Sequence, residues 1–313
     1  MGGCEDIGGC GANLSFCRSV RRFLPPRSRI FSALTGLVLV ASCPPYDLFI
    51  LAWLGLIPLF IALEETRGSG FSEGFIAGLV FNTGIVYWLA FNSGTYLAVA
   101  ATTLILAALI LALAWGTAAW IFIKLRRTIG FKAWLAVPFA WTTWEGWLAH
   151  LGEISFPWPL LTLTQSGFHP LLQVMEFTGE AGVSFWVAAV NVLLFVMIRT
   201  DNKQHWRFAA IFLFVLAIVP FTANMHALKH EKQSMGKTTA IAVQASVPAH
   251  EKWIKGAEYS WAIYDSLMRS TETGSFDIAV WPETAIPTHL LHQSMFMNEL
   301  VSVSYTHLRA HET

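Results

Sequence analysis

Charged residues are scarce in this chain of 313 residues: Asp, Glu, Lys and Arg together make up 13% of it, against about 25% in an average soluble domain. Hydrophobic residues make up 55%, and the mean hydropathy is +0.52. This balance excludes an ordinary soluble globular protein and indicates a membrane protein. The formal net charge of zero also gives no reason to expect a nucleic-acid partner.

Cysteine is scarce too. The chain has four cysteines, Cys4, Cys10, Cys17 and Cys43. The first three lie in a Gly-rich leader at spacings that match no zinc pattern, and His307 and His311 lack a third ligand. Residues 40–43 follow a basic stretch and an apolar run, as in a bacterial lipoprotein signal. Because two prolines and another apolar run follow Cys43, where a lipoprotein has a polar tether, the pattern disfavours lipidation of Cys43. We interpret the three leader cysteines as incidental thiols, and we predict no metal or cofactor.

Long apolar runs fill residues 30–223. A helix needs about 20 apolar residues to cross the hydrocarbon core of a bilayer, and several of the runs reach or approach that length. We predict about seven membrane-spanning helices, of which the first is short. They cover residues 30–42, 48–63, 75–91, 96–123, 133–151, 182–198 and 208–221.

Basic residues lie at alternate ends of these runs. Lys and Arg are retained on the cytoplasmic side of short loops. The 13 basic residues before Lys229 precede the first run or follow the second, fourth and sixth: Arg18, Arg21, Arg22, Arg27, Arg29, Arg67, Lys124, Arg126, Arg127, Lys132, Arg199, Lys203 and Arg207. Connections 44–47, 92–95 and 152–180 contain none. The pattern predicts a cytoplasmic N-terminus and places everything after about residue 223 outside.

Two polar residues within the predicted spans are candidates for function, Glu145 and Asn191. Polar groups are costly in lipid unless they are paired, so each either makes a hydrogen bond between helices or contacts a substrate. The connection after the fifth span contains two prolines in residues 156–159. Each proline lacks the N–H that a helix needs, which suits a non-spanning segment at the outer surface.

The composition changes after residue 224 to that of a soluble α/β unit. Residues 238–245 are rich in β-branched and small apolar residues and predict a strand. In residues 256–270, four apolar residues recur at helical spacing and predict one buried helix face. They are Ala257, Trp261, Tyr264 and Met268. Residues 278–281 predict a second, short buried strand, which Pro282 ends because it has no backbone donor.

The segment WPETAIP (281–287) carries the main candidate for chemistry, Glu283. The preceding strand presents this carboxylate at its carboxyl end, the place where α/β sheets collect catalytic groups. Two interpretations follow from the residues alone: Glu283 is catalytic, or it caps a following turn or helix.

The ordered set of motifs resembles the apolipoprotein N-acyltransferase family, the membrane-embedded member of the nitrilase (carbon-nitrogen hydrolase) superfamily. The motifs are the break at 43–47, the 75–92 segment with Tyr87 and Trp88, the 156–158 element, Gly182 to Ser184 leading to Asn191, Val243 with Gln244, and residues 281–285. The resemblance runs from about residue 30 to about 300. It implies a nitrilase-like α/β domain, an αββα sandwich, after the membrane domain.

The resemblance also implies a reaction. An acyl chain passes from a phospholipid donor to an enzyme cysteine as a thioester, and then to the α-amine of a diacylglyceryl-cysteine on an apolipoprotein acceptor. Glu283 matches the general base of that scheme, which activates a thiol that is mostly protonated at neutral pH. A lysine stabilises the oxyanion.

The cysteine and lysine of that scheme are not in this chain, since none of the 30 residues after Glu283 is Lys or Cys. The leader cysteines are predicted to be cytoplasmic and Cys43 lies at the first span, so none can substitute. We therefore expect an inactive N-terminal fragment with only the opening of the sandwich. Residues 304–313 depart from the family and are interpreted as a non-native tail.

These predictions define the organisation of the chain. Residues 1–29 form a cytoplasmic leader, 30–223 the membrane domain and 224–303 the beginning of the nitrilase-like domain, on the periplasmic side of a bacterial inner membrane. Two other functions remain open. A polytopic transporter or scaffold would show charges at mid-membrane, and a membrane-tethered nitrilase-type amidase would need only the glutamate motif.

Overall fold

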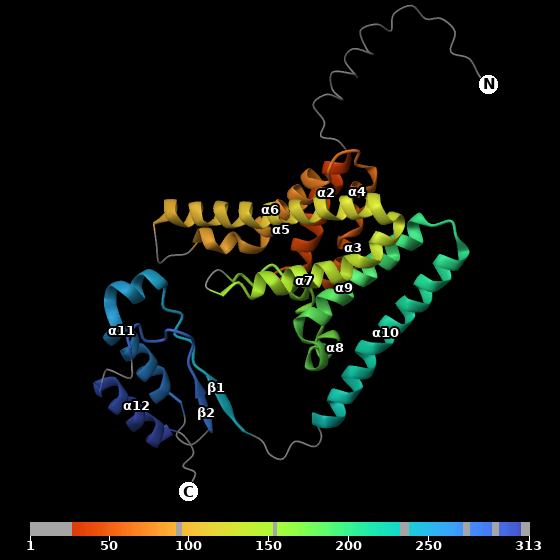
Figure 1. The fold of residues 1–313 in the computed structure, drawn as a ribbon. Coiled ribbons are helices and arrows are strands. Elements are labelled where there is room, and N and C mark those ends of the chain that lie inside the picture. Colours follow the sequence, from red (N-terminus) through yellow and green to blue (C-terminus); the bar gives the residue numbers. More distant parts are fainter. Residues whose placement is uncertain are drawn as a thin grey trace, which may run out of the picture. The chain divides into compact units, whose positions relative to one another are not determined.

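A computed structural model of the chain describes residues 27–91, 96–152, 155–231, 238–271, 276–289 and 294–307 (Figure 1). The chain divides into two compact units. The helical unit comprises Met1–Tyr87 and Leu104–Ala227, and the α/β unit comprises Trp88–Thr103 and Leu228–Thr313. Of the predicted leader, residues 1–26 lie outside the described residues. So do residues 308–313 of the predicted tail, whereas residues 304–307 belong to helix α12.

Helical structure occupies all seven segments that were predicted to span a membrane. The elements are α2 (Arg27–Ser42), η1 (Phe49–Leu51), α3 (Ala52–Gly55), α4 (Ile57–Glu65), α5 (Phe71–Val86), η2 (Tyr87–Phe91), α6 (Leu97–Ile129), η3 (Gly130–Ala136), α7 (Val137–Ala149), α9 (Met175–Arg199) and α10 (Lys203–Glu231). Between α7 and α9 the described chain forms only short helices, η5 (Leu161–Gln165) and α8 (His169–Leu172). The double-proline connection is thus not part of a long helix.

Four stretches of the described residues are long and apolar enough to cross a membrane, so the protein is mainly helical with multiple membrane-spanning segments. They are Phe71–Phe91, Leu97–Ala149, Met175–Arg199 and Lys203–His226. The second contains 53 residues, which as one straight helix would extend about 80 Å, well beyond a hydrocarbon core of about 30 Å. It combines two of the predicted segments. The 16 residues of α2 fall short of the usual length.

The second predicted segment is not one continuous helix, and here the prediction was wrong. It is interrupted at Leu56, between α3 and α4. Asn191 of α9 satisfies the backbone groups at this break: its Oδ1 accepts from the Leu56 N–H at 2.9 Å, and its Nδ2 donates to the Ala52 carbonyl at 2.8 Å. An interrupted helix is tolerated in an apolar environment where a neighbouring helix supplies such partners.

Small residues bring α5 and α6 into close contact. A Cβ on Gly74 would lie 2.5 Å from the Trp115 carbonyl oxygen, and one on Gly78 would lie 2.5 Å from the Trp115 Cβ. Larger residues at either position would therefore force the helices apart. Such small-residue contacts are typical of helix packing in membranes.

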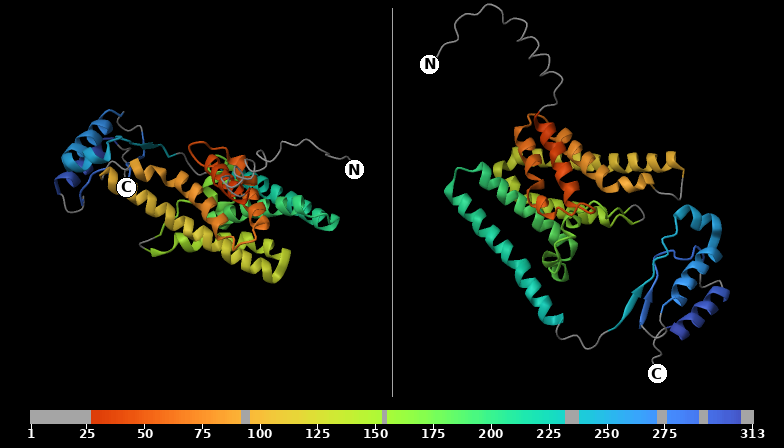
Figure 2. Two further views of the ribbon diagram at one scale, coloured as in Figure 1. Left: turned by 90° about the horizontal axis from the view of Figure 1, so that it is seen from above. Right: turned by 180° about the vertical axis from the view of Figure 1, so that it is seen from behind.

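From residue 238 onward, the described part of the α/β unit forms two short parallel strands and two helices. Strand β1 (Ala240–Ala242) pairs with β2 (Ile278–Val280), with Ile241 opposite Ala279. Helix α11 (Ala249–Arg269) connects the strands, and α12 (Ser294–His307) follows and packs on α11. Both helices lie on one side of the strand pair (Figure 2).

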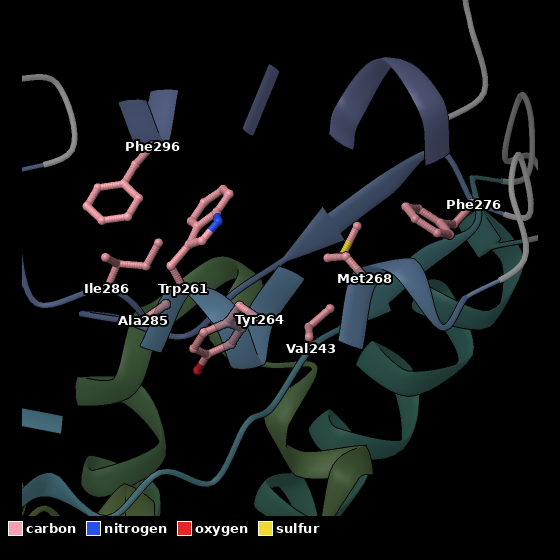
Figure 3. Packing of buried hydrophobic residues seen from close by; sticks show 8 residues of the cluster. All are labelled: Val243, Trp261, Tyr264, Met268, Phe276, Ala285, Ile286 and Phe296. Carbon is pink, nitrogen blue, oxygen red and sulfur yellow. The ribbon is translucent and has the colours of Figure 1, made fainter. Parts of the chain in front are cut away.

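The core of this unit lies between the strands and the two helices (Figure 3). Its buried members are Val243, Trp261, Tyr264, Met268, Phe276, Ala285, Ile286 and Phe296. Three of the four residues predicted to form the apolar helix face are among them, and Ala257 packs against the cluster as a partly buried member. The predicted helix face is confirmed.

Both strands differ from the prediction. β1 is shorter than residues 238–245, and β2 is not a buried strand, because Ile278 and Val280 are 48% and 54% exposed. The helices cover one face of this two-stranded sheet, and the side chains of Ile278 and Val280 alternate with the packed Ala279. The sequence run is apolar throughout, so it does not distinguish a strand covered on one face from one covered on both.

Candidate active site

Glu283 lies in a tight turn just beyond the carboxyl end of β2. A hydrogen bond of 3.1 Å from the Ala285 N–H to the Pro282 carbonyl closes the turn. Thr284 has a φ of 53°, in the left-handed region that β-branched residues rarely adopt. Backbone strain of this kind persists where the surrounding structure fixes it, and it is concentrated at functional sites.

Buried residues fix the turn on both sides. Trp281 stacks on Tyr264 of α11 with ring centroids 4.9 Å apart. Beyond the turn, Ala285 and Ile286 are 8% and 4% exposed and belong to the core of the α/β unit. The turn is therefore held at both ends, while Glu283 between them is exposed.

Lys252 is a second polar residue at this turn. Its Nζ donates to the Thr284 Oγ1 at 3.1 Å. Sequence analysis did not single it out, because the helix was expected to begin at residue 256. In the structure α11 begins at Ala249 and is kinked at Gly256, where φ is 80°. In the sequence, Gly256 indicates where the helix is kinked, but it does not indicate that Lys252 contacts Thr284.

The Glu283 carboxylate has no hydrogen-bond or ion-pair partner among the residues that the structure describes. An ionised carboxylate only accepts hydrogen bonds, so an exposed one without a partner is available to a proton donor that approaches it. This is the arrangement that a general base requires before substrate binds. Within the described ranges, no three His, Cys, Asp or Glu side chains are grouped as metal ligands.

Glu145, in the helical unit, is in the opposite situation. Its side chain is buried, and its Oε1 accepts from the Trp141 Nε1 and from the Leu161 N–H, both at 2.7 Å. Thr162 is held in turn by Ser184 of α9, whose Oγ accepts from the Thr162 N–H at 3.1 Å. Glu145 thus joins α7 to the segment that contains η5, which agrees with the hydrogen-bonding interpretation.

Asn191 and Cys43 are also buried within the helical unit. The Asn191 Nδ2 donates to the Val187 carbonyl at 2.8 Å in addition to its two bonds at the helix break. Cys43 is free and fully buried within the helical unit. The other three cysteines lie outside the described residues. Of the described residues proposed for function from the sequence, Glu145, Asn191 and Glu283, the last alone is exposed and has an ionisable group without a partner in the described part of the chain.

Comparison with known proteins gives a consistent match. The family described as "Apolipoprotein N-acyltransferase N-terminal domain" matches residues 35–193. The chain is 28% identical over 287 residues to a protein named apolipoprotein N-acyltransferase from Geobacter metallireducens, an alignment that covers 88% of this chain and 55% of the relative. It is 28% identical over 272 residues to the protein of the same name from Chlorobaculum tepidum, covering 82% and 49%.

A protein with that name from Coxiella burnetii is 24% identical over 285 residues, covering 87% of this chain and 56% of the relative. The chain therefore spans about half the length of the curated relatives it matches. The family match lies within the helical region and ends well before Glu283.

Proposed function

This chain belongs to the apolipoprotein N-acyltransferase family, and we propose that it supplies the membrane domain and the first part of the catalytic domain of an enzyme that transfers an acyl chain to lipoproteins. The observation that carries the proposal is the family match over residues 35–193. The exposed, unpartnered carboxylate of Glu283 supports it from the other end of the chain.

The proposed topology has seven spans. It rests on the seven helical segments and on the alternation of basic connections along the sequence. By the retention of Lys and Arg in the cytoplasm, the N-terminus lies inside and the α/β unit lies on the periplasmic side of a bacterial inner membrane. Glu283 would then work on the outer side, where mature lipoprotein N-termini are presented.

The proposed reaction has two steps. A cysteine thiolate attacks the acyl ester of a phospholipid, forming a thioester and releasing the lysophospholipid; Glu283 takes the thiol proton and returns it to the leaving alkoxide. The α-amine of a diacylglyceryl-cysteine then attacks the thioester. Glu283 takes the amine proton and returns it to the sulfur, so the thiol is regenerated as the amide forms.

Lys252 has a positioning role in this proposal. Through Thr284 it holds the backbone on the C-terminal side of Glu283, while Trp281 holds the N-terminal side. A carboxylate fixed by its backbone but free at its oxygens needs little reorganisation when a donor arrives. We propose that the αββα sandwich of the whole enzyme covers the exposed face of β1 and β2.

The test is complementation. The reading frame would be recovered from source DNA together with the codons that follow it, and the whole protein expressed in a bacterium depleted of its own apolipoprotein N-acyltransferase. We expect growth to be restored and lipoproteins to carry a third acyl chain. Normal expression in the membrane without any third acyl chain would contradict the proposal.

The 313-residue chain alone provides a second test. Its buried Cys43 and its leader cysteines do not match the nucleophile of the scheme. We expect no thioester when the purified chain is incubated with phospholipid that carries a labelled acyl chain. A hydroxylamine-sensitive label on this chain would show that one of its own cysteines is the nucleophile and would overturn the assignment.

A further inference from the structure

Arginines gather where three helices of the helical unit end. Glu64, at the end of α4, accepts from the Arg126 Nη2 of α6 at 3.3 Å and from the Arg199 Nε of α9 at 3.0 Å. Arg127 of α6 donates from Nη2 to the Gly68 carbonyl at 2.7 Å. One carboxylate therefore ties together the C-terminal ends of α4, α6 and α9.

A cavity of about 390 Å³ opens at this point, which we call the arginine cavity. Its walls include Glu64, Arg126, Arg127, Arg199 and Trp134. Its size lies within the range of small-molecule sites, about 300–1,000 Å³. Three positive charges against one negative charge leave it with an excess of two positive charges.

Trp134 gives independent evidence for a ligand. Its side chain is 1% exposed, and its ring is fixed between Phe60, Phe122 and Phe195 at centroid distances of 4.9, 4.5 and 4.5 Å. Its Nε1 has no hydrogen-bond partner among the described residues. Buried donors in folded proteins nearly always have an acceptor, and Trp134 is one of the residues that line the cavity.

The chemistry of the walls defines the missing acceptor. Guanidinium and indole groups only donate hydrogen bonds, and Arg199 uses only Nε on Glu64 within the described part of the chain. Its terminal nitrogens match the bidentate geometry of phosphate oxygens. Helix C-termini also attract arginines, which would account for the charges but not for the cavity or for the unpartnered Trp134 Nε1.

Most of the other residues that line the cavity are apolar. Leu63, Phe122 and Ile123 line it on the side of the apolar helices. Lys124 directly follows Ile123 on α6, and its ammonium lies 3.7 Å from the centroid of the Trp120 ring, an amphipathic pair typical of the headgroup level. We propose that the arginine cavity binds the phosphodiester headgroup of an anionic phospholipid. This site is separate from the proposed acyl transfer and does not depend on it.

The experiment is native mass spectrometry of the purified 313-residue chain in detergent micelles. The probes are phosphatidylglycerol, phosphatidylcholine with the same acyl chains, and inorganic phosphate. We expect phosphatidylglycerol to bind most tightly, and Arg199→Gln to weaken it about tenfold, the effect of losing one charge-assisted hydrogen bond. Arg207→Gln is the matched control, since this exposed arginine of α10 does not line the cavity.

Two further variants keep the test decisive if Arg199→Gln does not fold. Trp134→Phe keeps a ring and removes only the N–H, so it should weaken phosphatidylglycerol binding. Glu64→Gln removes the competing carboxylate and should tighten it. Equal binding of the two lipids, or equal effects of Arg199→Gln and Arg207→Gln, would overturn the proposal. Competition by inorganic phosphate at the same concentration would overturn the lipid assignment in favour of a soluble phosphate.

Discussion

Glu145 in the helical unit and Glu283 in the α/β unit are both carboxylates close to tryptophan in the sequence, yet their surroundings in the structure are opposite. Glu145 is 6% exposed and accepts two hydrogen bonds of 2.7 Å. Glu283 is exposed, and no partner reaches it among the described residues. At Glu283, contacts of the neighbouring residues hold the backbone. At Glu145, hydrogen bonds hold the carboxylate itself.

This contrast separates a structural carboxylate from one that is available for chemistry. The Oε1 of Glu145 accepts from donors of both α7 and the η5 segment, so a substrate would have to displace bonds that hold the unit together. No residue in the described part of the chain bonds the oxygens of Glu283, so a substrate has no such bond to displace there. The rigid backbone with free oxygens is what we expect of a residue that transfers protons.

Replacing the two carboxylates by alanine should therefore have very different effects on stability. Glu145→Ala leaves the Trp141 and Leu161 donors without an acceptor and should destabilise the helical unit by about 3 kcal/mol. Glu283→Ala should change stability by less than about 0.5 kcal/mol. Unfolding in mixed micelles titrated with a denaturing detergent measures both. Equal destabilisation would show that Glu283 is also structural.

Asn191 extends the contrast to an uncharged group. Asn191→Leu removes three hydrogen bonds, two of them at the break between α3 and α4, and should cost about 2 kcal/mol at about 0.6 kcal/mol for each bond in a membrane. The control is Asn82→Leu. Asn82 is also fully buried, but among the described residues it bonds only the Gly78 carbonyl of its own helix. The same unfolding assay should give a smaller loss for Asn82→Leu, and the reverse order would refute this account of the break.

Lys252 tests whether the fixed backbone beside Glu283 matters. In the whole enzyme, Lys252→Gln should lower kcat about fivefold with KM unchanged, the value of one exposed hydrogen bond, and Lys252→Arg should restore most of it. Lys255→Gln is the control on the same helix, because Lys255 pairs with Glu251 instead. A loss confined to KM, or no rescue by arginine, would rule out a positioning role.

The Lys255–Glu251 pair should show the weakest effect. The hydrogen bond to Glu251 raises the pKa of Lys255. A raised lysine pKa contributes stability below the unfolded value of about 10.4, and that contribution is lost as the pH rises through the folded pKa. Lys255→Gln should thus lower the melting temperature only slightly, and by the same amount from about pH 6 to pH 9. A difference that varies within that range would show that the pair is less exposed than in the structure.

Hydrophobic pattern predicted the helical segments well, because long apolar runs determine where helices form. It missed the break at Leu56, since the group that satisfies this backbone, Asn191, lies 135 residues further along the chain. The length of the run gave no sign of it. The sequence identified Asn191 as a polar group that needs hydrogen-bond partners, but it did not identify those partners as the backbone groups of Leu56 and Ala52.

In the α/β unit, the sequence predicted the buried face of α11 and the position of Glu283 after a strand. It did not predict the exposure of Ile278 and Val280, because an apolar run does not reveal how many faces of a strand are covered. The contact of Lys252 with Thr284 depends on the kink at Gly256 and on the left-handed turn. The glycine marks the position of the kink, but neither feature identifies Thr284 as the partner of Lys252.

The most direct measurement is the rate of acyl transfer by the whole enzyme, encoded by the reading frame with its following codons, when Glu283 is replaced by glutamine. The assay would follow a labelled acyl chain from phospholipid to a diacylglyceryl-cysteine peptide, with Glu258→Gln as an exposed carboxylate control on α11. The proposed role predicts a loss of at least about a hundredfold for Glu283→Gln and none for Glu258→Gln. Retention of full activity by Glu283→Gln would contradict it.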